Sequence, residues 1–142
     1  MLDLSAAFDV LDHKLLLNKL SCYGFEAAAV EWIQSYLSDR KYTVFFNGSY
    51  SGLMPVSCGV PQGSSLGPLL FSIFLNDLPL MLNHATVAMY ADDSTIYSSS
   101  ETASELERVL NNELKVTERW MRLNKLVLNK EKTKRIVLGL SY

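Results

Sequence analysis

Two adjacent carboxylates, Asp92 and Asp93, lie in the segment AMYADDST between two apolar stretches. Like charges this close together repel, and a cation bound between them removes the repulsion. Mg²⁺ suits such a pair because one or two carboxylates hold it while it keeps water and substrate phosphate oxygens. The alternative is a solvated turn, because aspartate is common in turns.

A further carboxylate extends the candidate site. The opening segment LDLSAAFDVLDH starts with a short apolar alternation that ends at Asp3, so we expect Asp3 at a strand end beside the Asp92 turn. Three carboxylates can hold two metal ions roughly 3.5–4 Å apart, which stabilises both reacting oxygens in phosphoryl transfer. Asp9 and Asp12 compete with Asp3 for this role. Both lie where the chain turns into a helix, which Asp12 or Ser5 can simply cap.

Four helices are predicted around these carboxylates. Apolar residues at helical spacing define them, and they span 11–25, 26–40, 64–82 and 102–124. Ser65 is the expected cap of the third helix. Thr102 and Glu105 form a capping box at the start of the fourth. One face of that helix is marked by Leu106, Leu110, Leu114, Thr117 and Met121.

Strand-like segments separate the helices. Residues 41–57 are rich in β-branched and aromatic side chains around Asn47-Gly48, which predicts a hairpin, and Pro55 favours an edge for its second arm. Residues 85–100 form two arms around the aspartate pair, and LVLN and RIVLGL near the end are also strand-like. This mixture predicts an α+β fold, with an antiparallel sheet and helices packed on one face.

Composition limits the class of protein. The chain has 142 residues, 49% of them hydrophobic and 20% charged, which suits one compact domain over 1–142 and excludes global disorder. The most apolar stretch, 66–82, contains Asp77 and two prolines, so we expect a core helix there and no membrane span. With only Cys22 and Cys58 and no secretory signal, we expect an intracellular setting in which both thiols are packed.

Charge is distributed unevenly along the chain. The net charge is −2, but residues 1–118 hold 6 basic and 14 acidic side chains (−8), and residues 119–142 hold 7 and 1 (+6). A basic cluster of this kind can contact a phosphate backbone. A solvated helix face and strand edge is the alternative. The basic residues are Arg119, Arg122, Lys125, Lys130, Lys132, Lys134 and Arg135.

Four segments in order, LDLSAAFDVLDHKLL, GVPQGSSLGPLLFSIFLNDLP, MYADDST and LVLNKEKTK, strongly resemble the palm motifs of reverse transcriptases. The similarity is greatest to LINE-type (non-LTR) retrotransposons. EWIQSYLSDRKYTVFFNGSYS also resembles the family's stretch between the first two motifs, so the resemblance covers nearly the whole chain. YADD alone would be weak evidence, whereas four ordered motifs make coincidence negligible. The resemblance implies a truncated, palm-like RNA-directed DNA polymerase domain over 1–142.

The resemblance also implies a metal site. Asp3, Asp92 and Asp93 match the carboxylates that hold two Mg²⁺ ions, for which Mn²⁺ can substitute, and the carbonyl of Leu4 matches a further ligand. Such ions lower the pKa of a primer 3′-hydroxyl and neutralise charge on the transferred phosphate, so no side-chain nucleophile is needed.

Nucleotide contacts follow from the first two motifs. Phe8 matches the aromatic residue under the incoming sugar, with ordinary core packing as the alternative. In GVPQGSS, Gln62 matches the residue that touches the incoming or templating nucleotide. Gly59 and Gly63 would let the backbone approach the base pair. The two serines of this motif can equally cap the next helix.

The last two motifs supply two further roles. Tyr90 matches a residue that supports the primer end, although a strand tyrosine is often simply half-buried. Lys132 is favoured by spacing as the group that protonates the departing pyrophosphate, and Lys130 and Lys134 are close rivals.

The resemblance implies RNA template, DNA primer and dNTP as partners, no membrane, and action in the cytoplasm and nucleus. Because Met1 lies two residues before Asp3, we expect the fingers segment to be missing, and the thumb as well. Metal coordination is then expected to survive and processive polymerisation to be lost. A gene-model fragment and a degraded element copy both stay open. Two alternatives are a non-catalytic interaction remnant of the palm and an unrelated α+β domain whose aspartates bind Ca²⁺ or nothing.

Overall fold

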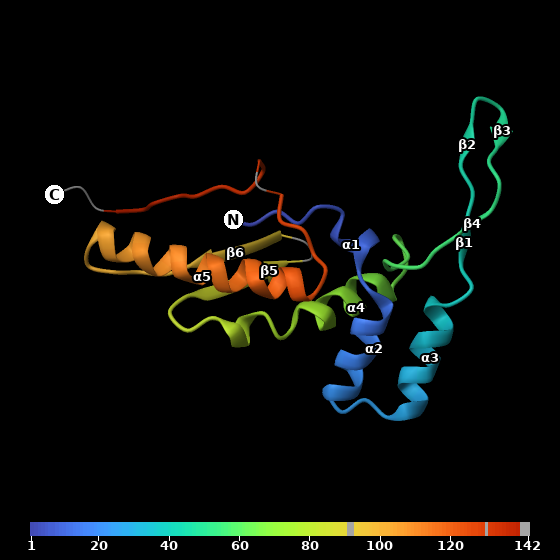
Figure 1. Cartoon of the computed structure of the whole chain (residues 1–142), viewed down its shortest axis with the longest axis horizontal. Coiled ribbons are helices and arrows are strands. Elements are labelled where there is room, and N and C mark those ends of the chain that lie inside the picture. The colour runs from blue at the N-terminus through green and yellow to red at the C-terminus, as the bar shows by residue number, and fades with distance from the viewer. Residues whose placement is uncertain (91–92, 130, 140–142) are drawn as a thin grey trace. The chain divides into compact units, whose positions relative to one another are not determined.

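The computed structural model describes residues 1–90, 93–129 and 131–139 (Figure 1). It divides into two compact units, residues 8–74 and residues 1–7 together with the described part of 75–142. The single partial domain over 1–142 stays a prediction. Helices and small antiparallel two-stranded sheets alternate along the chain, which confirms the predicted α+β class. Within the described ranges, no helix has the length and apolar character needed to cross a membrane.

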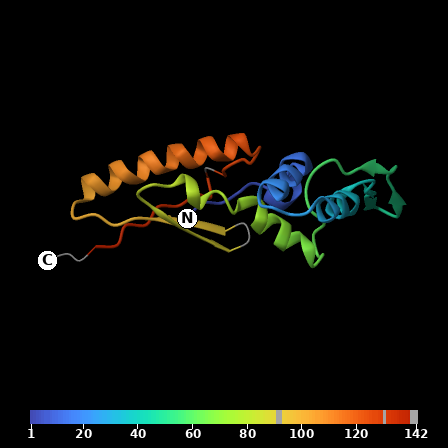
Figure 2. The same cartoon turned by 90° about the horizontal axis from the view of Figure 1, so that it is seen from below.

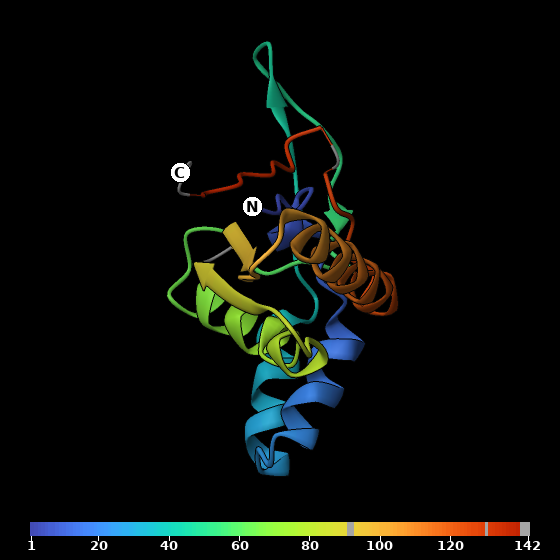
Figure 3. The same ribbon diagram turned by 90° about the vertical axis from the view of Figure 1, so that its left-hand side faces the viewer.

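Two helices of the 8–74 unit lie where the sequence predicts them. After the short α1 (Ala7–Val10), α2 spans His13–Cys22 and α3 spans Ala27–Leu37, and the two lie side by side (Figure 3). The Asp12 carboxylate accepts the Leu15 N–H at 3.0 Å and caps α2. This confirms the capping alternative for Asp12.

The predicted hairpin at Asn47-Gly48 is confirmed. Both residues have positive φ, 50° and 81°, which the tight hairpin turn requires. Four short strands form this part of the unit: β1 (Lys41–Tyr42) pairs with β4 (Met54–Pro55), and β2 (Phe45–Phe46) pairs with β3 (Ser49–Tyr50). Nearby, Cys58 is exposed, as is Cys22 in the last turn of α2, so the prediction that both thiols are packed is wrong. Cys22 is the last residue of α2, and Cys58 lies in the loop between β4 and the next helix.

The apolar helix is shorter than predicted. α4 spans Leu66–Leu75, and a separate turn of 3₁₀ helix, η1, spans Pro79–Met81, so one helix over 64–82 is wrong. Proline has no N–H and disfavours the helical conformation of the residue before it, which separates the two. Ser64 supplies the cap in place of Ser65, because its Oγ accepts the Gly67 N–H at 3.0 Å.

The other unit contains a hairpin and the longest helix. β5 (Thr86–Tyr90) pairs in antiparallel fashion with β6 (Asp93–Tyr97), and α5 (Ala103–Leu123) lies across one face of this hairpin (Figures 1 and 2). Strand side chains alternate between a less exposed face, which includes Ser94, and an exposed face.

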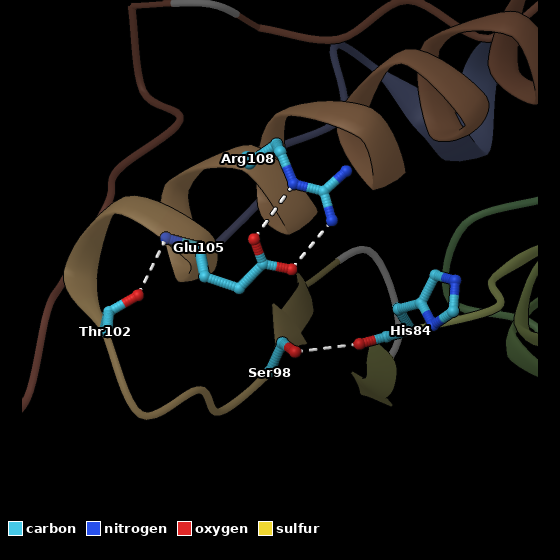
Figure 4. A network of polar contacts seen from close by, with 5 residues as sticks. All are labelled: His84, Ser98, Thr102, Glu105 and Arg108. Atoms are coloured by element: carbon cyan, nitrogen blue, oxygen red, sulfur yellow. Dashed lines mark hydrogen bonds and ion pairs between the residues drawn. The ribbon is translucent and has the colours of Figure 1, made fainter.

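Thr102 caps α5 as predicted, with its Oγ1 accepting the Glu105 N–H at 3.3 Å (Figure 4). The Glu105 carboxylate accepts two hydrogen bonds from Arg108, at 3.0 and 2.7 Å. This pairing holds the pKa of Glu105 below its ordinary value. The Ser98 hydroxyl donates to the His84 carbonyl at 2.8 Å, which ties together the two ends of the β5–β6 hairpin.

The buried face of α5 includes Trp120, which the predicted face lacks, and it departs from the prediction at Leu114. Leu114 is 37% exposed, while its neighbour Glu113 is only 3% exposed. The prediction is wrong here because the Glu113 carboxylate accepts the backbone N–H of His84 at 2.9 Å and that of Asn83 at 3.3 and 3.4 Å. The two backbone N–H groups compensate for the burial of the Glu113 carboxylate, whereas a buried carboxylate without hydrogen-bond partners would destabilise the fold.

Replacing Glu113 with alanine is expected to lower the free energy of unfolding by about 1–3 kcal/mol, because the Asn83 and His84 N–H groups lose their acceptor. Glu107→Ala, in the same helix, is the control. It removes only an exposed ion pair with Arg135, 3.1 Å long, and is expected to change the free energy by less than about 1 kcal/mol. Urea denaturation of both variants measures the difference, and equal losses would contradict the role of Glu113 as acceptor for the Asn83 and His84 N–H groups.

The segments LVLN and RIVLGL do not form strands in the described residues. Leu128 makes a single bridge with Leu4, and residues 135–139 are not in any sheet. These predictions are therefore wrong, because a strand needs a partner whatever its own β propensity.

Candidate active site

The segment that carries Asp3 lies between two others. Leu2 and Ser94 form an antiparallel bridge, with the Leu2 N–H donating to the Ser94 carbonyl at 2.6 Å and the Ser94 N–H donating back at 3.4 Å. On its other side Leu4 bridges Leu128. Leu2 and Leu4 are buried. Because strand side chains alternate, Asp3 points to the opposite face.

This register brings two of the predicted carboxylates together. In an antiparallel ladder, the pair next to Leu2 and Ser94 is Asp3 and Asp93, and directly opposite side chains have Cβ atoms about 4.5–5.5 Å apart. Asp93 also stands opposite Tyr90 of β5. Tyr90 is 85% exposed and Asp93 is exposed, so all three share the solvent face of the sheet. Asp3 thus stands beside Asp93, whereas its predicted position beside the Asp92 turn involves a residue outside the described ranges and stays a prediction.

The third carboxylate, Asp92, lies outside the described residues. Within the described part of the chain, the Asp3 and Asp93 carboxylates have no hydrogen-bonding or ion-pair partner, and no group of three or more His, Cys, Asp or Glu side chains gathers. Two carboxylates on one exposed face are the hard oxygen donors that a divalent cation takes. The residues present therefore fit such an ion.

The Leu4 carbonyl is directed toward the same region. The bonds that flank the Leu4–Leu128 bridge run from the Ser5 N–H to Val127 and from the Asn129 N–H to Asp3, both 2.9 Å. Because these bonds are made by the neighbours of Leu4, its own backbone N–H and carbonyl point away from Leu128 and toward the side on which Leu2 pairs with β6. The ligand role of the Leu4 carbonyl itself stays a prediction.

The fourth motif forms a turn against the strand of Asp3. Asn129 organises it: its side chain accepts the Lys132 N–H at 3.2 Å, and its carbonyl accepts the Thr133 hydroxyl at 2.7 Å. The Thr133 Oγ1 in turn accepts the Asp3 N–H at 3.5 Å. Asn129 and Thr133 thus link this turn to the segment of Asp3, and although both lie in LNKEKTK, the sequence analysis gave neither of them a role. An asparagine three residues before Lys132 is the signal of a side-chain-capped turn that would have found the first.

The structure does not distinguish among the three lysines predicted as candidates for the general acid. Lys132 is exposed on this turn, and Lys134, also exposed, donates its backbone N–H to the Met1 carbonyl at 3.0 Å. Lys130 lies outside the described residues. Exposed basic side chains of this unit also include Arg119, Arg122 and Lys125. Positive charge next to a carboxylate site would attract a polyanionic substrate.

The second motif packs on the other half of the first motif, in the 8–74 unit. The Gly59 N–H donates to the Leu11 carbonyl at 2.7 Å, and the Val60 N–H donates to the Phe8 carbonyl at 2.8 Å. Gly59 has φ +82°, and a Cβ there would lie 2.7 Å from the Asp9 carbonyl oxygen. The close approach that glycine permits is thus to the chain's own backbone.

The remaining nucleotide-site candidates have partners within this unit. The Gln62 side chain donates to the Asp9 carboxylate at 2.7 Å, and Phe8 stacks on Phe71 with ring centroids 4.4 Å apart. Gly63, with φ +76°, has open space around it. The two competing metal-ligand candidates therefore make other hydrogen bonds: Asp9 accepts one from Gln62, and Asp12 caps α2. The predicted nucleotide contacts of Phe8, Gln62 and Gly63 stay predictions.

Comparison with known proteins adds an independent line of evidence. The family model of reverse transcriptase (RNA-dependent DNA polymerase) matches residues 1–142. The chain is 37% identical over 139 residues to the "Probable RNA-directed DNA polymerase from transposon BS" of Drosophila melanogaster, covering 93% of this chain and 15% of that protein. It is 31% identical over 138 residues to the "RNA-directed DNA polymerase from mobile element jockey" of the same species, with 92% and 15% covered.

A third relative is the "Retrovirus-related Pol polyprotein from type-1 retrotransposable element R2" of Popillia japonica, 30% identical over 82 residues, with 58% of this chain and 14% of that protein covered. The chain thus spans about 15% of the length of the curated relatives it matches best in coverage. The resemblance to enzymes of non-LTR retrotransposons is confirmed. Since the family model extends from the first residue to the last, the chain belongs to the reverse transcriptase family.

Proposed function

We propose that this chain carries the catalytic carboxylates of an RNA-directed DNA polymerase from a non-LTR retrotransposon. The reaction is transfer of a nucleotide from a dNTP to the 3′-hydroxyl of a DNA primer on an RNA template. The observation that carries the proposal is the strand register that sets Asp3 opposite Asp93 on an exposed face, in a chain that matches the family throughout.

In this reaction the primer 3′-oxygen forms a bond to the α-phosphorus, and the bond from that phosphorus to pyrophosphate breaks. Asp3, Asp92 and Asp93, with the Leu4 carbonyl, would hold Mg²⁺, or Mn²⁺ in its place. Bound divalent ions supply charge neutralisation at the transferred phosphate and acidify the 3′-hydroxyl. The chain's own task is to hold the carboxylates in place, and the Leu2–Ser94 and Leu4–Leu128 bridges support this by fixing the segment that carries Asp3.

Other residues take supporting roles in the proposal. Tyr90, exposed beside Asp93, supports the primer end, and Lys132 or one of its two neighbouring lysines gives a proton to the departing pyrophosphate. Phe8 and Gln62 contact the incoming nucleotide. A setting in cytoplasm and nucleus follows from the same family expectation.

The isolated chain is proposed to bind the cation without processive polymerisation. It spans about 15% of the curated relatives' length, and contacts to remote parts of the substrates supply the orientation that the reacting centre needs. Cation binding is therefore the property by which the proposal is tested most directly.

The test compares the chain with Asp92→Ala by titrating Mn²⁺, with its electron paramagnetic resonance signal as the readout, and by primer extension with RNA template, dNTPs and Mg²⁺. We expect the substitution to weaken Mn²⁺ binding by about tenfold or more, because even the loss of a group that only hydrogen-bonds a metal ligand lowers metal affinity by that factor. Any primer extension must vanish in the variant. Equal affinities, or extension that survives the substitution, would contradict the proposal.

A further inference from the structure

Three exposed basic side chains form a row along the second half of α5. Lys115, Arg119 and Arg122 are separated by four and three residues, so they lie on one side of the helix. We call these three residues the basic stripe. At a rise of 1.5 Å per residue, the stripe extends over about 10 Å along the helix axis.

The basic stripe points away from the core of its unit. Each residue of an α-helix is rotated by about 100° from the one before it, and each member of the stripe stands two positions from a buried residue of α5. Two positions correspond to about 200°, so the stripe lies on the side of α5 opposite to its buried face. The buried residues are Glu113, Thr117, Trp120 and Met121.

The stripe and the carboxylates lie on opposite sides of the sheet. Leu2 and Thr117 of α5 line the same cavity, and α5 lies across one face of the β5–β6 hairpin (Figure 2). Because side chains alternate along a strand, Asp3 and Asp93 point to the other face. A helix with its side chains is about 10–12 Å thick, so nucleotides that react at the carboxylates are out of reach of the stripe.

The charge of α5 and its flanks changes sign along the helix. Residues 101–113 contain four acidic side chains and one basic (−3), and residues 114–125 contain one acidic and four basic (+3). In the first half, Glu105 accepts two hydrogen bonds from Arg108, at 3.0 and 2.7 Å. In the described part of the chain, no acidic side chain pairs with a member of the basic stripe, and this includes Glu118 beside it. The stripe is therefore a concentrated positive charge that is available to an anionic partner.

The spacing of the stripe matches a sugar-phosphate backbone. One strand of a DNA double helix carries a phosphate about every 3.4 Å along the axis, so about three phosphates face a row of three cations about 10 Å long. Basic side chains that neutralise phosphates release counterions and gain affinity. Such contacts position a nucleic acid without reading its sequence. The stripe thus fits the backbone of a duplex of any sequence.

We propose that the basic stripe binds the phosphate backbone of a nucleic-acid duplex outside the catalytic face. This site is separate from the one at which the primer reacts, so the inference goes beyond the proposed function. Lys115, Arg119 and Arg122 each contact one phosphate, while the acidic first half of α5 repels the strand. The duplex is therefore held along the second half of the helix.

The experiment measures, by fluorescence anisotropy, the binding of a short labelled DNA duplex and of the RNA duplex of the same sequence. EDTA removes divalent cations, so a failure of the proposed metal site does not affect the result. We expect Lys115→Gln/Arg119→Gln/Arg122→Gln to bind one or both duplexes about tenfold or more weakly at about 0.1 M salt. A plot of log affinity against log salt concentration should become shallower by about 3, since each lost phosphate contact removes about 0.9. The duplex whose binding is lost is the partner.

The matched control is Lys14→Gln/Lys41→Gln/Arg108→Gln. It removes the same total charge from exposed positions in α2, in β1 and in the first half of α5. We expect both affinities to stay within about threefold of the parent chain, because charges more than about 10 Å from the bound phosphates are largely screened at this salt concentration.

A second measurement needs no variant. When the duplex is added to the parent chain, the nuclear magnetic resonance signals of the Arg119 and Arg122 guanidinium N–H groups are expected to shift. Shifts that appear instead at the backbone amides of Asp3 and Asp93 would place the nucleic acid on the catalytic face and overturn the inference.

Two results of the binding experiment would also overturn it. Equal losses in both triple variants would show that only the net charge of the chain matters. Binding by the stripe variant that equals binding by the parent chain, with a lower thermal stability, would leave the three cations only their favourable interaction with the C-terminal end of the helix dipole.

Discussion

Asp3→Asn is expected to weaken divalent-cation binding by about tenfold to a hundredfold, because it removes one of the two charged oxygen donors on the exposed face while keeping the size of the side chain. Asp3 stands opposite Asp93 through the Leu2–Ser94 bridge, and its carboxylate has no other partner in the described part of the chain. Its replacement therefore changes the charge of the site and leaves the strand pairing intact. Mn²⁺ titration measures the effect.

Asp9→Asn is the matched control for this prediction. Asp9 belongs to the same motif and carries the same charge, but its carboxylate accepts a hydrogen bond from Gln62 at 2.7 Å, which an asparagine oxygen can also accept. We expect cation affinity within about twofold of the parent chain, since the charge removed is screened by solvent. A larger loss with Asp9→Asn than with Asp3→Asn would transfer the ligand role to Asp9.

Gly59→Ala is expected to lower the free energy of unfolding by about 2–5 kcal/mol. About 1–2 kcal/mol comes from placing a Cβ at φ +82°, and about 1–3 kcal/mol from overlap in a packed region. The added carbon would lie 2.7 Å from the Asp9 carbonyl oxygen and 2.8 Å from that of Phe8, so backbone would have to move. Urea denaturation followed by circular dichroism provides the measurement.

Gly63→Ala separates the two contributions. Gly63 has a similar φ, +76°, but among the described residues other than its chain neighbours no atom lies within 4 Å of the position that its Cβ would take. We expect only the conformational loss of about 1–2 kcal/mol. If both variants lose the same stability, then the close approach of Gly59 to the first motif is not what this glycine is needed for.

The sequence alone determined the features that depend on residues a few positions apart. The Asp12 and Thr102 caps and the Asn47-Gly48 turn are confirmed, because each arises from a hydrogen bond or a φ preference within three residues. The order of the four motifs likewise indicates the reverse transcriptase family, which the family model confirms over residues 1–142.

The tertiary structure decided everything that depends on a distant partner. Glu113 is buried because backbone donors 29 and 30 residues away reach it, and residues 135–139 remain outside any sheet because no strand lies beside them. Asp3 and Asp93 are 90 positions apart, and their alignment follows from one bridge between their neighbours. The sequence of one segment determines how its side chains alternate between the two faces. The register between two segments depends on the backbone pairing and the burial that both can achieve together, so the sequence of either segment alone does not determine it.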